Sequence, residues 1–307
     1  MSDPVHTLAD LDHWPHAGTS LAVLGHPIAH SLSPPMHNAA LAWLAQRDPR
    51  FRDWRYFRFD VPPHDLPRAL ALLHEKKFFG LNLTVPHKII AFDLISEIDP
   101  AAQPIGAVNT LIRTERGWHG YNTDGYGLAM AVDEKLHHTI AGSHIIILGA
   151  GGAARGTAVE CIKQGCASLW IHNRTQKNLT ELSVLLAGIS ENSGRIPLHE
   201  LPPNSSFANL PKDMLVINAT SLGLHADDPS PIDLDKLPRP AGVYDMIYNP
   251  PETALLAQAR ERKIPYANGL SMLVHQGAKS LEIWTGVPAA ETAPVMRTAA
   301  EAALHGV

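Results

Sequence analysis

The sequence predicts an α/β protein with mostly parallel sheets, and three observations support this fold class. Short apolar segments that suit strands alternate along the chain with segments that suit helices. The segment 144–148 (HIIIL) is short, β-branched and apolar, which is typical of a strand buried on both faces. A glycine-rich loop follows it directly and leads into a helix-forming segment. Because 307 residues exceed the usual size of one domain, we expect two α/β domains.

The first domain is expected to open with a buried strand at 21–24 (LAVL), which Gly25 ends. Ser33 as N-cap and Pro34 in the first turn then predict a helix. The alternating aromatic and basic residues of 54–59 predict a half-exposed strand. The remaining predicted elements are a helix at 66–73 and strands at 79–85 and 108–112.

The second domain is expected to begin near Gly125, with a helix at 126–136 before the buried strand and another helix behind the glycine loop. The segment 201–209, which contains two prolines, is expected to be a surface loop. The other predicted elements are strands at 169–172, 214–219 and 243–246, and helices at 253–262 and 271–285. The last helix is amphipathic and follows a complete second domain, so we expect it to pack back on the first.

Composition excludes several classes of function. The formal net charge is −5, so the chain lacks the basic surface that a nucleic-acid backbone attracts. No apolar run is long enough to span a bilayer, and the first sixteen residues resemble neither a signal nor a transit peptide. Cys161 and Cys166 lack a redox spacing and are expected to be buried thiols. We expect a cytoplasmic monomer or homodimer with a small-molecule substrate and no nucleic-acid or membrane partner.

The eighteen histidines do not predict a metal site. His26, His30 and His37 are close together in the sequence, but their spacing matches neither a helical metal-binding pair nor a zinc module. We therefore expect no metal ion.

The glycine loop is the strongest local indication of a ligand. Gly149, Gly151 and Ala154 fit the dinucleotide-binding pattern and lie between a strand and a helix, as that pattern requires. Gly149 allows a tight turn, and Gly151 lets a pyrophosphate approach the backbone with no Cβ in the way. The helix N-terminus offers free N–H groups and a positive dipole end. A plain glycine turn is the alternative.

The end of the next strand indicates which dinucleotide is bound. An NAD site usually places an acidic residue there, but residues 173–177 (NRTQK) contain none. Arg174 can pair with a 2′-phosphate, and Asn173 and Thr175 can donate hydrogen bonds to it. The segment therefore favours NADP(H), and an exposed basic loop is the alternative.

Polar residues also interrupt the first domain where strands are expected to end. Ser31 and Ser33 lie beside a helix N-terminus, which suits a carboxylate. Lys88 follows a buried strand, where α/β proteins gather their chemistry, although a lone lysine is more often a solvated helix residue. Asn109 and Asp124 lie in two further polar segments that simple turns would also explain.

Taken together, these segments resemble the shikimate dehydrogenase family along nearly the whole chain. The matching segments are 25–34 (GHPIAHSLSP), 82–88 (NLTVPHK), 106–110 (GAVNT), 122–125 (NTDG), the glycine loop, 173–175 (NRT), 218–221 (NATS), 244–248 (YDMIY) and 268–276 (NGLSMLVHQ). So many motifs in one order make a chance match implausible.

The resemblance implies an α/β enzyme with two domains and its active site in the cleft between them. Residues 1–125, completed by C-terminal helices at 270–307, would form the substrate-binding and catalytic domain, and 126–269 a Rossmann domain that binds NADP(H). The implied reaction is the reversible, NADPH-dependent reduction of 3-dehydroshikimate to shikimate, on the route to chorismate and the aromatic amino acids. The implied substrate-binding residues are Ser31, Ser33, Thr84, Lys88, Asn109, Asp124, Tyr248 and Gln276.

Lys88 and Asp124 are the implied catalytic pair. A hydride that reaches a carbonyl carbon leaves an alkoxide, which needs a proton and a nearby positive charge. A lysine ammonium supplies both, and Asp124 can orient it and favour its charged form. The sequence leaves open whether Lys88 transfers the proton or acts mainly by orientation and charge.

The resemblance also implies a set of cofactor-binding residues and shows two departures from the family pattern. Asn178 stands where the family often has a basic residue, although Lys177 is adjacent, and Ser271 stands where it often has glycine. For the two methionines of the set, ordinary core packing is the alternative. The implied cofactor residues are Gly149, Ala150, Gly151, Gly152, Ala153, Asn173, Arg174, Thr175, Lys177, Met246, Gly269 and Met272.

Two other functions are compatible with the motifs. One is an NAD-dependent quinate or quinate/shikimate dehydrogenase, against which the absence of an acid at 173–174 argues. The other is a non-catalytic relative that senses a shikimate-like acid or NADPH, against which the presence of both Lys88 and Asp124 argues.

Overall fold

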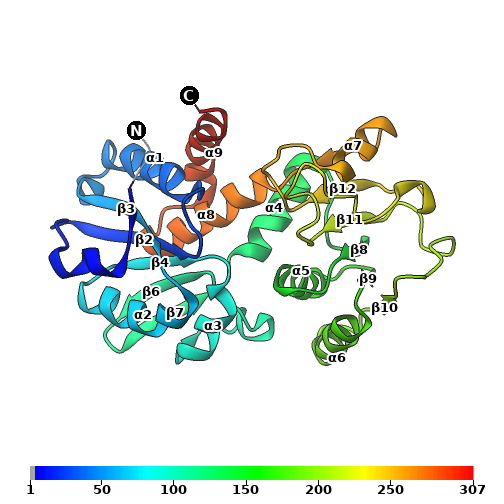
Figure 1. Ribbon diagram of the computed structural model, residues 1–307, viewed down its shortest axis with the longest axis horizontal. Helices are drawn as coiled ribbons and strands as arrows, with labels where there is room; N and C mark the ends of the chain where they lie inside the picture. The colour runs from blue at the N-terminus through cyan, green and yellow to red at the C-terminus, as the bar shows by residue number, and fades with distance from the viewer. Residues whose placement is uncertain (1–3, 307) are drawn as a thin grey trace. The chain divides into compact units, whose positions relative to one another are not determined.

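The computed structural model describes residues 4–306, which form two compact units (Figure 1). The described residues up to Thr123 and those from Val274 onwards form the first unit. The second unit runs from Asp124 to Leu273. Each unit is a sheet with helices packed against it, so the α/β fold class is confirmed.

The sheet of the first unit has the strand order β1-β3-β2-β4-β6-β7-β5. Its neighbours are parallel except that β6 is antiparallel to both β4 and β7, so the sheet is mostly parallel as expected. The strands are β1 (Val5–His6), β2 (Thr19–Gly25), β3 (Trp54–Asp60), β4 (Gly80–Leu83), β5 (Glu97–Ile98), β6 (Thr110–Thr114) and β7 (Gly117–Tyr121).

Helices pack against this sheet and differ in the residues they cover. Ala22, Leu24 and Leu81 belong to the core that lies under α2. Tyr56 of β3 points to the other face of the sheet, where its ring stacks on His37 of α1 and lies near Trp284 of α8. The helices with residues in this unit are α1 (Ser33–Ala45), α2 (Leu66–Glu75), α3 (His87–Leu94), α8 (Leu270–Thr285), whose first four residues belong to the second unit, and α9 (Ala289–His305), with short 3-10 helices at Leu8–His13, Pro49–Phe51, Pro63–Asp65 and Gln103–Ile105.

The sheet of the second unit is wholly parallel, in the order β10-β9-β8-β11-β12-β13. As the sequence predicts, β8 is buried, and it lies inside the sheet between β9 and β11. The strands are β8 (His144–Leu148), β9 (Ser168–His172), β10 (Leu198–Leu201), β11 (Leu215–Asn218), β12 (Gly242–Asp245) and β13 (Tyr266–Ala267). The helices are α4 (Asp124–Leu136), α5 (Gly152–Lys163), α6 (Gln176–Asn192) and α7 (Ala254–Glu261), with a 3-10 helix at Leu234–Lys236.

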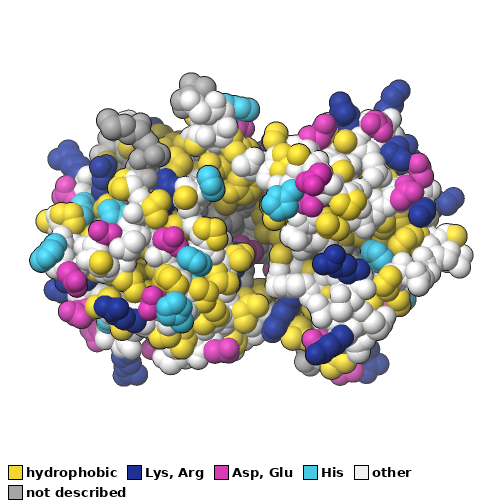
Figure 2. All heavy atoms as spheres, viewed as in Figure 1, with side chains coloured by type: hydrophobic (Ala, Val, Ile, Leu, Met, Phe, Trp, Pro, Cys, Tyr) yellow, Lys and Arg dark blue, Asp and Glu magenta, His cyan; other side chains and the backbone are white. Residues whose placement is uncertain are grey.

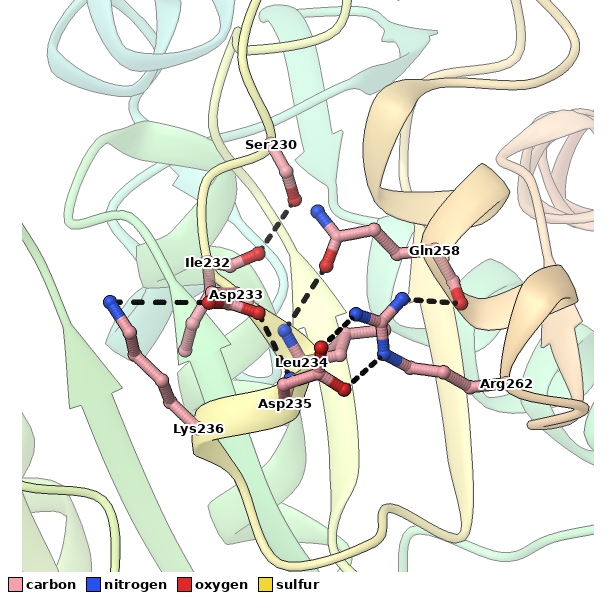
Figure 3. Close-up of polar contacts among 8 residues, drawn as sticks. All are labelled: Ser230, Ile232, Asp233, Leu234, Asp235, Lys236, Gln258 and Arg262. Atoms are coloured by element: carbon pink, nitrogen blue, oxygen red, sulfur yellow. Dashed lines mark hydrogen bonds and ion pairs between the residues drawn. The ribbon is translucent and has the colours of Figure 1, made fainter.

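A network of polar contacts attaches the connection between β11 and β12 to α7 (Figure 3). The Leu234 N–H donates to Gln258 Oε1 at 3.1 Å, and Arg262 Nε donates to Asp235 Oδ1 at 2.7 Å. Within the connection, the Ser230 hydroxyl donates to the Ile232 carbonyl at 2.7 Å. These bonds fix a long connection that contains no strand among its described residues.

Several expectations about local structure were wrong. Ser33 is the first residue of α1 and Leu32 its N-cap, while the Ser31 hydroxyl accepts the Ser33 N–H at 3.3 Å. The strand at 54–59 is more buried than the expected half-exposed strand, because Tyr56, Arg58 and Phe59 are all buried. Arg58 is only 6% exposed, and its guanidinium donates to the Ala29 carbonyl.

Two further boundaries differ from the expected ones. The strand predicted at 108–112 begins at Thr110, because the Val108 N–H donates to the Lys88 carbonyl at 2.9 Å instead of joining a ladder. The segment 201–209 is not wholly a surface loop. Leu201 ends β10 and is buried, and Phe207 packs against the same core.

Candidate active site

A cavity of about 320 Å³ lies at the carboxyl ends of β8, β9 and β11 in the second unit. This is the edge of a parallel sheet at which ligands are usually bound. Six of the predicted cofactor residues line it, and so do residues of the 219–222 segment after β11. The lining is formed by Leu148, Gly149, Ala150, Gly151, His172, Asn173, Arg174, Thr175, Asn178, Ala219, Thr220, Ser221, Leu222 and Pro231.

The glycine loop has the geometry that a pyrophosphate requires. Gly149 has φ +112°, which a side chain would strain, and its N–H donates to the His172 carbonyl at 2.8 Å. Gly151 is the N-cap of α5, and a Cβ built on it would meet no protein atom within 4 Å. Gly152 and Ala153 follow as the exposed first turn of that helix. The loop therefore presents open space and free N–H groups at a helix N-terminus, which fits a dinucleotide phosphate.

The segment after β9 supplies the charge expected for a 2′-phosphate. Asn173 is held by its own turn, because its side-chain amide donates to the Thr175 carbonyl at 2.9 Å. Arg174 lines the cavity and is exposed. Lys177 lies on the first turn of α6, with its Nζ 3.9 Å from Glu181 Oε1. Of these two neighbours, Asn178 lines the cavity and Lys177 does not. No carboxylate is among the lining residues, so nothing in the lining would repel a second phosphate.

The residues predicted near the nicotinamide are packed within the second unit. The Thr157 hydroxyl contacts Met246 Sδ at 3.6 Å. A Cβ on Gly269 would lie 2.0 Å from the Met246 carbonyl oxygen, so only glycine fits there. Met272 is 9% exposed, and its N–H donates to the Tyr244 hydroxyl at 3.2 Å. Both methionines therefore have core contacts, which the sequence left as the alternative.

The predicted substrate residues of the first unit follow the carboxyl ends of two neighbouring strands. Ser31 lies in the connection after β2, and Thr84 comes directly after β4. The Thr84 N–H donates to the Leu24 carbonyl at 3.0 Å, and the His26 N–H donates to the Val85 carbonyl at 3.3 Å. These bonds hold the two strand ends together, as in other parallel sheets that form sites at this edge.

Lys88 and Asn109 belong to the same edge. Lys88 is half-buried in the first turn of α3 and not at the strand end itself. Asn109 precedes β6, which runs antiparallel to β4 with Asn82 opposite Thr110. This reversal brings the start of β6 to the carboxyl end of β4. Asn109 therefore lies beside the segment that carries Lys88, whose carbonyl accepts the Val108 N–H.

A buried polar network fixes Asn109 and Gln276. The Asn109 side-chain amide donates to Gln276 Oε1 at 3.3 Å and to the Thr123 hydroxyl at 3.0 Å. Its Oδ1 accepts the Thr123 N–H at 2.9 Å. Ser280, which has no exposed surface, lies 2.7 Å from the Thr110 hydroxyl and accepts from Asn82 at 3.0 Å. Sequence reasoning missed Asn82 and Ser280 as support for this site.

Asp124 and Tyr248, the other two predicted substrate residues, belong to the second unit. Asp124 is the half-buried first residue of α4, and Tyr248 lies in the segment after β12. Burial raises the pKa of the Tyr248 phenol, which therefore keeps its proton at neutral pH and can donate to an anion.

Comparison with known proteins identifies the family. The family model "Shikimate dehydrogenase substrate binding domain" matches residues 23–111, and "Shikimate 5'-dehydrogenase C-terminal domain" matches 269–301. A protein of Moorella thermoacetica named shikimate dehydrogenase (NADP(+)) is 42% identical over 94% of this chain and 97% of its own length. The chain belongs to the shikimate dehydrogenase family.

Solved structures of the shikimate dehydrogenase family support this assignment. A shikimate dehydrogenase crystallised with NADP⁺ is 33% identical, covers 98% of each chain and has a TM-score of 0.80. The shikimate 5-dehydrogenase of Thermus thermophilus, crystallised with NADP(H) and shikimate, is 34% identical over 93% of this chain and 99% of its own, with a TM-score of 0.77.

Ser271, which stands where the shikimate dehydrogenase family often has glycine, has a hydrogen-bond partner in the structure. Ser271 is 2% exposed, and its hydroxyl donates to Glu134 Oε2 of α4 at 2.9 Å. The hydroxymethyl group that replaces hydrogen at this position is thus bonded to a neighbouring helix. This contact accounts for how a serine is accommodated there.

Proposed function

We propose that this chain catalyses the NADP(H)-dependent, reversible reduction of 3-dehydroshikimate to shikimate. The observation that carries the proposal is the combination of two sites of different chemistry. The second unit has a dinucleotide cavity with Arg174 and no carboxylate in its lining. The first unit gathers Lys88 and Asn109 at the carboxyl edge of its sheet, with Gln276 bonded to Asn109. Family membership supports the same reaction.

We assign different residues to the phosphates of the cofactor and to the polar groups of the substrate. The N–H groups at the start of α5 would hold the pyrophosphate, and Arg174, Asn173 and Thr175 the 2′-phosphate. Of the predicted residues, Lys177 faces Glu181 at 3.9 Å, so we assign the main positive charge to Arg174. Ser31, Ser33 and the protonated Tyr248 phenol would donate to the substrate carboxylate, and Thr84, Asn109 and Gln276 would bind the ring hydroxyls.

Lys88 and Asp124 are the proposed catalytic pair. NADPH, when bound, supplies a hydride for the carbonyl carbon. The Lys88 ammonium would donate a proton to the carbonyl oxygen as negative charge develops there, giving the alcohol. Asp124 would orient the ammonium and accept a hydrogen bond from the neighbouring hydroxyl. In the reverse direction, neutral Lys88 would take the hydroxyl proton.

The test is a set of four assays that follow the absorbance of the reduced nicotinamide. Shikimate and quinate are each offered with NADP⁺ and with NAD⁺. Turnover mainly with shikimate and NADP⁺ is expected. Turnover mainly with quinate and NAD⁺ would contradict the proposal and favour the quinate enzyme. Absence of turnover despite NADPH binding would favour a sensing relative.

We also propose a cytoplasmic protein that acts as a monomer or homodimer. None of the helices in residues 4–306 is apolar over a length sufficient to span a membrane. On the face seen in Figure 2, Lys and Arg side chains are interspersed with Asp and Glu and do not form one basic patch. Cell fractionation and light scattering would test the two proposals separately.

A further inference from the structure

One buried carboxylate in the second unit joins three segments, and one of them, the segment after β11, lines the dinucleotide cavity. Asp245 is the last residue of β12 and has no exposed surface. Its Oδ1 accepts the side-chain amide of Asn218 and the backbone N–H of Ile247, both at 3.0 Å. Its Oδ2 accepts the Thr253 hydroxyl at 2.7 Å. A carboxylate is buried this completely only where such donors replace water.

The first of these links reaches the cavity wall through Asn218. Asn218 is also wholly buried, and its Oδ1 accepts the N–H of Thr220 at 3.0 Å and its hydroxyl at 2.7 Å. Its amide nitrogen donates to Asp245 and to the Leu222 carbonyl at 3.2 Å. Because a carboxylate only accepts, Asp245 sets the orientation of the Asn218 amide. That orientation determines the turn of Thr220–Leu222, which lines the cavity.

The second link fixes the segment that carries Met246 and Tyr248. The Ile247 N–H is held by Asp245, and the Ile247 carbonyl accepts the Gly269 N–H at 3.0 Å. The Met246 N–H donates to the Asn218 carbonyl at 3.1 Å. The segment after β12 is therefore bonded on both sides, and one of its anchors is the same carboxylate that orients the cavity wall.

The third link connects the carboxylate to the start of α7. Thr253 is the N-cap of this helix, and its hydroxyl oxygen accepts the Leu256 N–H at 3.3 Å. The same hydroxyl donates to Asp245. The carboxylate is thus bonded to the residue that caps this helix.

We propose that Asp245 is a positioning residue for the dinucleotide. Through Asn218 and Ile247 it holds the Thr220–Leu222 wall and the Met246–Tyr248 segment in one arrangement, so that both are in place before NADP(H) binds. The inference rests on the proposed function for the identity of the ligand. Because Asp245 has no exposed surface, it would act on the dinucleotide through Asn218 and Ile247 and not by direct contact.

The test compares two substitutions at this position with a matched control. Asp245→Ala removes both acceptors, whereas Asp245→Asn keeps an oxygen for Asn218 and Ile247 and turns an amide N–H toward the Thr253 hydroxyl. The control is Asp235→Ala, which removes an exposed carboxylate of the same unit together with its bonds to Arg262. Circular dichroism and thermal melting show that each variant is folded at the assay temperature.

The readouts are the Kd of NADPH from fluorescence titration, and KM and kcat with shikimate and NADP⁺. We expect Asp245→Ala to weaken NADPH binding and raise the KM for NADP⁺ by about tenfold, with a smaller change in kcat at saturation. Asp245→Asn should bind NADPH within about threefold of the wild type, and Asp235→Ala as the wild type does. A purely structural role would lower the melting temperature of Asp245→Ala without changing its Kd.

Each outcome decides between these roles. Wild-type NADPH affinity in folded Asp245→Ala would overturn the inference, and so would equal losses in the alanine and asparagine variants. If Asp245→Ala does not fold, Asn218→Ala cuts the link to the wall while the bonds to Ile247 and Thr253 remain. It should again weaken NADPH about tenfold, and unchanged affinity would refute the proposal. Failure of the wild type to bind NADPH would instead contradict the proposed function.

Discussion

His37 should make the first unit less stable as the pH is lowered. The ring has no exposed surface, stacks on Tyr56 with centroids 4.1 Å apart, and has Nδ1 2.9 Å from the Ser33 carbonyl. Burial lowers the pKa of His37 from about 6.5 to about 4, despite the hydrogen bonds that the ring donates to backbone carbonyls, which favour the charged form. At pH values between about 4 and about 6.5, His37 therefore binds a proton in the unfolded chain but not in the folded chain.

The size of the effect follows from this difference. The contribution of neutral His37 to the free energy of unfolding is fully present above the pKa that this residue has in the unfolded chain. It is lost as the pH falls toward the pKa of about 4 in the folded chain. The loss from His37 is about 3 kcal/mol over the whole window, and about 2 kcal/mol between roughly pH 7.5 and roughly pH 5. His37→Asn removes the titrating ring but keeps an amide N–H that can reach the Ser33 carbonyl.

Urea unfolding of the wild type and His37→Asn at these two pH values measures the effect. The variant is expected to be less stable at both, because it leaves a cavity against Tyr56. Between the two pH values, however, it should lose about 2 kcal/mol less than the wild type. His64→Asn is the control, since that ring is 80% exposed and meets water in both states. An equal loss of stability in the wild type and His37→Asn would refute the reasoning.

Three further predictions concern catalysis, cofactor choice and packing. Lys88→Met should lower kcat by about 10²–10⁴-fold and leave the Kd of NADPH unchanged, and a near-normal kcat would rule out Lys88 as the proton donor. Arg174→Ala should raise the KM for NADP⁺ about tenfold and change that for NAD⁺ little, whereas equal changes would mean that Arg174 does not bind the 2′-phosphate. Gly80→Ala should destabilise the protein by about 1–3 kcal/mol, because its Cβ would lie 2.2 Å from Trp284 Nε1. Gly188→Ala in helix α6, where a Cβ meets nothing within 4 Å, should instead stabilise it by up to about 1 kcal/mol, and similar melting temperatures for the two variants would contradict the packing argument.

The elements that the sequence predicted best are those whose local pattern and tertiary role agree. β8 is apolar on both faces and lies inside a parallel sheet, and the glycine loop joins it to α5 as the motif requires. In β3, by contrast, the basic residues suggested an exposed face. The structure buries Arg58 because its guanidinium reaches the Ala29 carbonyl, a partner that the local pattern does not show.

Three of the elements that the sequence analysis missed have weak local patterns. α6 contains Thr180, Ser183 and Gly188, which are poor helix formers, and α3 follows a proline and is only eight residues long. β7 has glycine at both 117 and 120, and it is fixed by antiparallel pairing with β6. In each case, packing and pairing against the rest of the unit provide what local propensity lacks.

The cavity residues Thr220 and Ser221 could have been found from the sequence, whereas Ser280 could not. The first two directly follow an expected strand, and the carboxyl ends of neighbouring parallel strands meet at one edge. Ser280 lies on the amphipathic helix predicted at 271–285. Nothing local to that helix shows that its hydroxyl meets Asn82, which is 198 residues earlier in the chain.

This long-range contact explains why the first unit needs the C-terminal end of the chain. Asn82 donates to Thr110 and Ser280, and the Thr123 hydroxyl donates to the Gln276 carbonyl at 3.0 Å. All these groups except Gln276 are buried, so without α8 their polar atoms would face an apolar core or admit water. The same helix brings Gln276 to Asn109. One helix therefore completes both the buried network and the proposed substrate site, which ties the formation of the site to the folding of the unit.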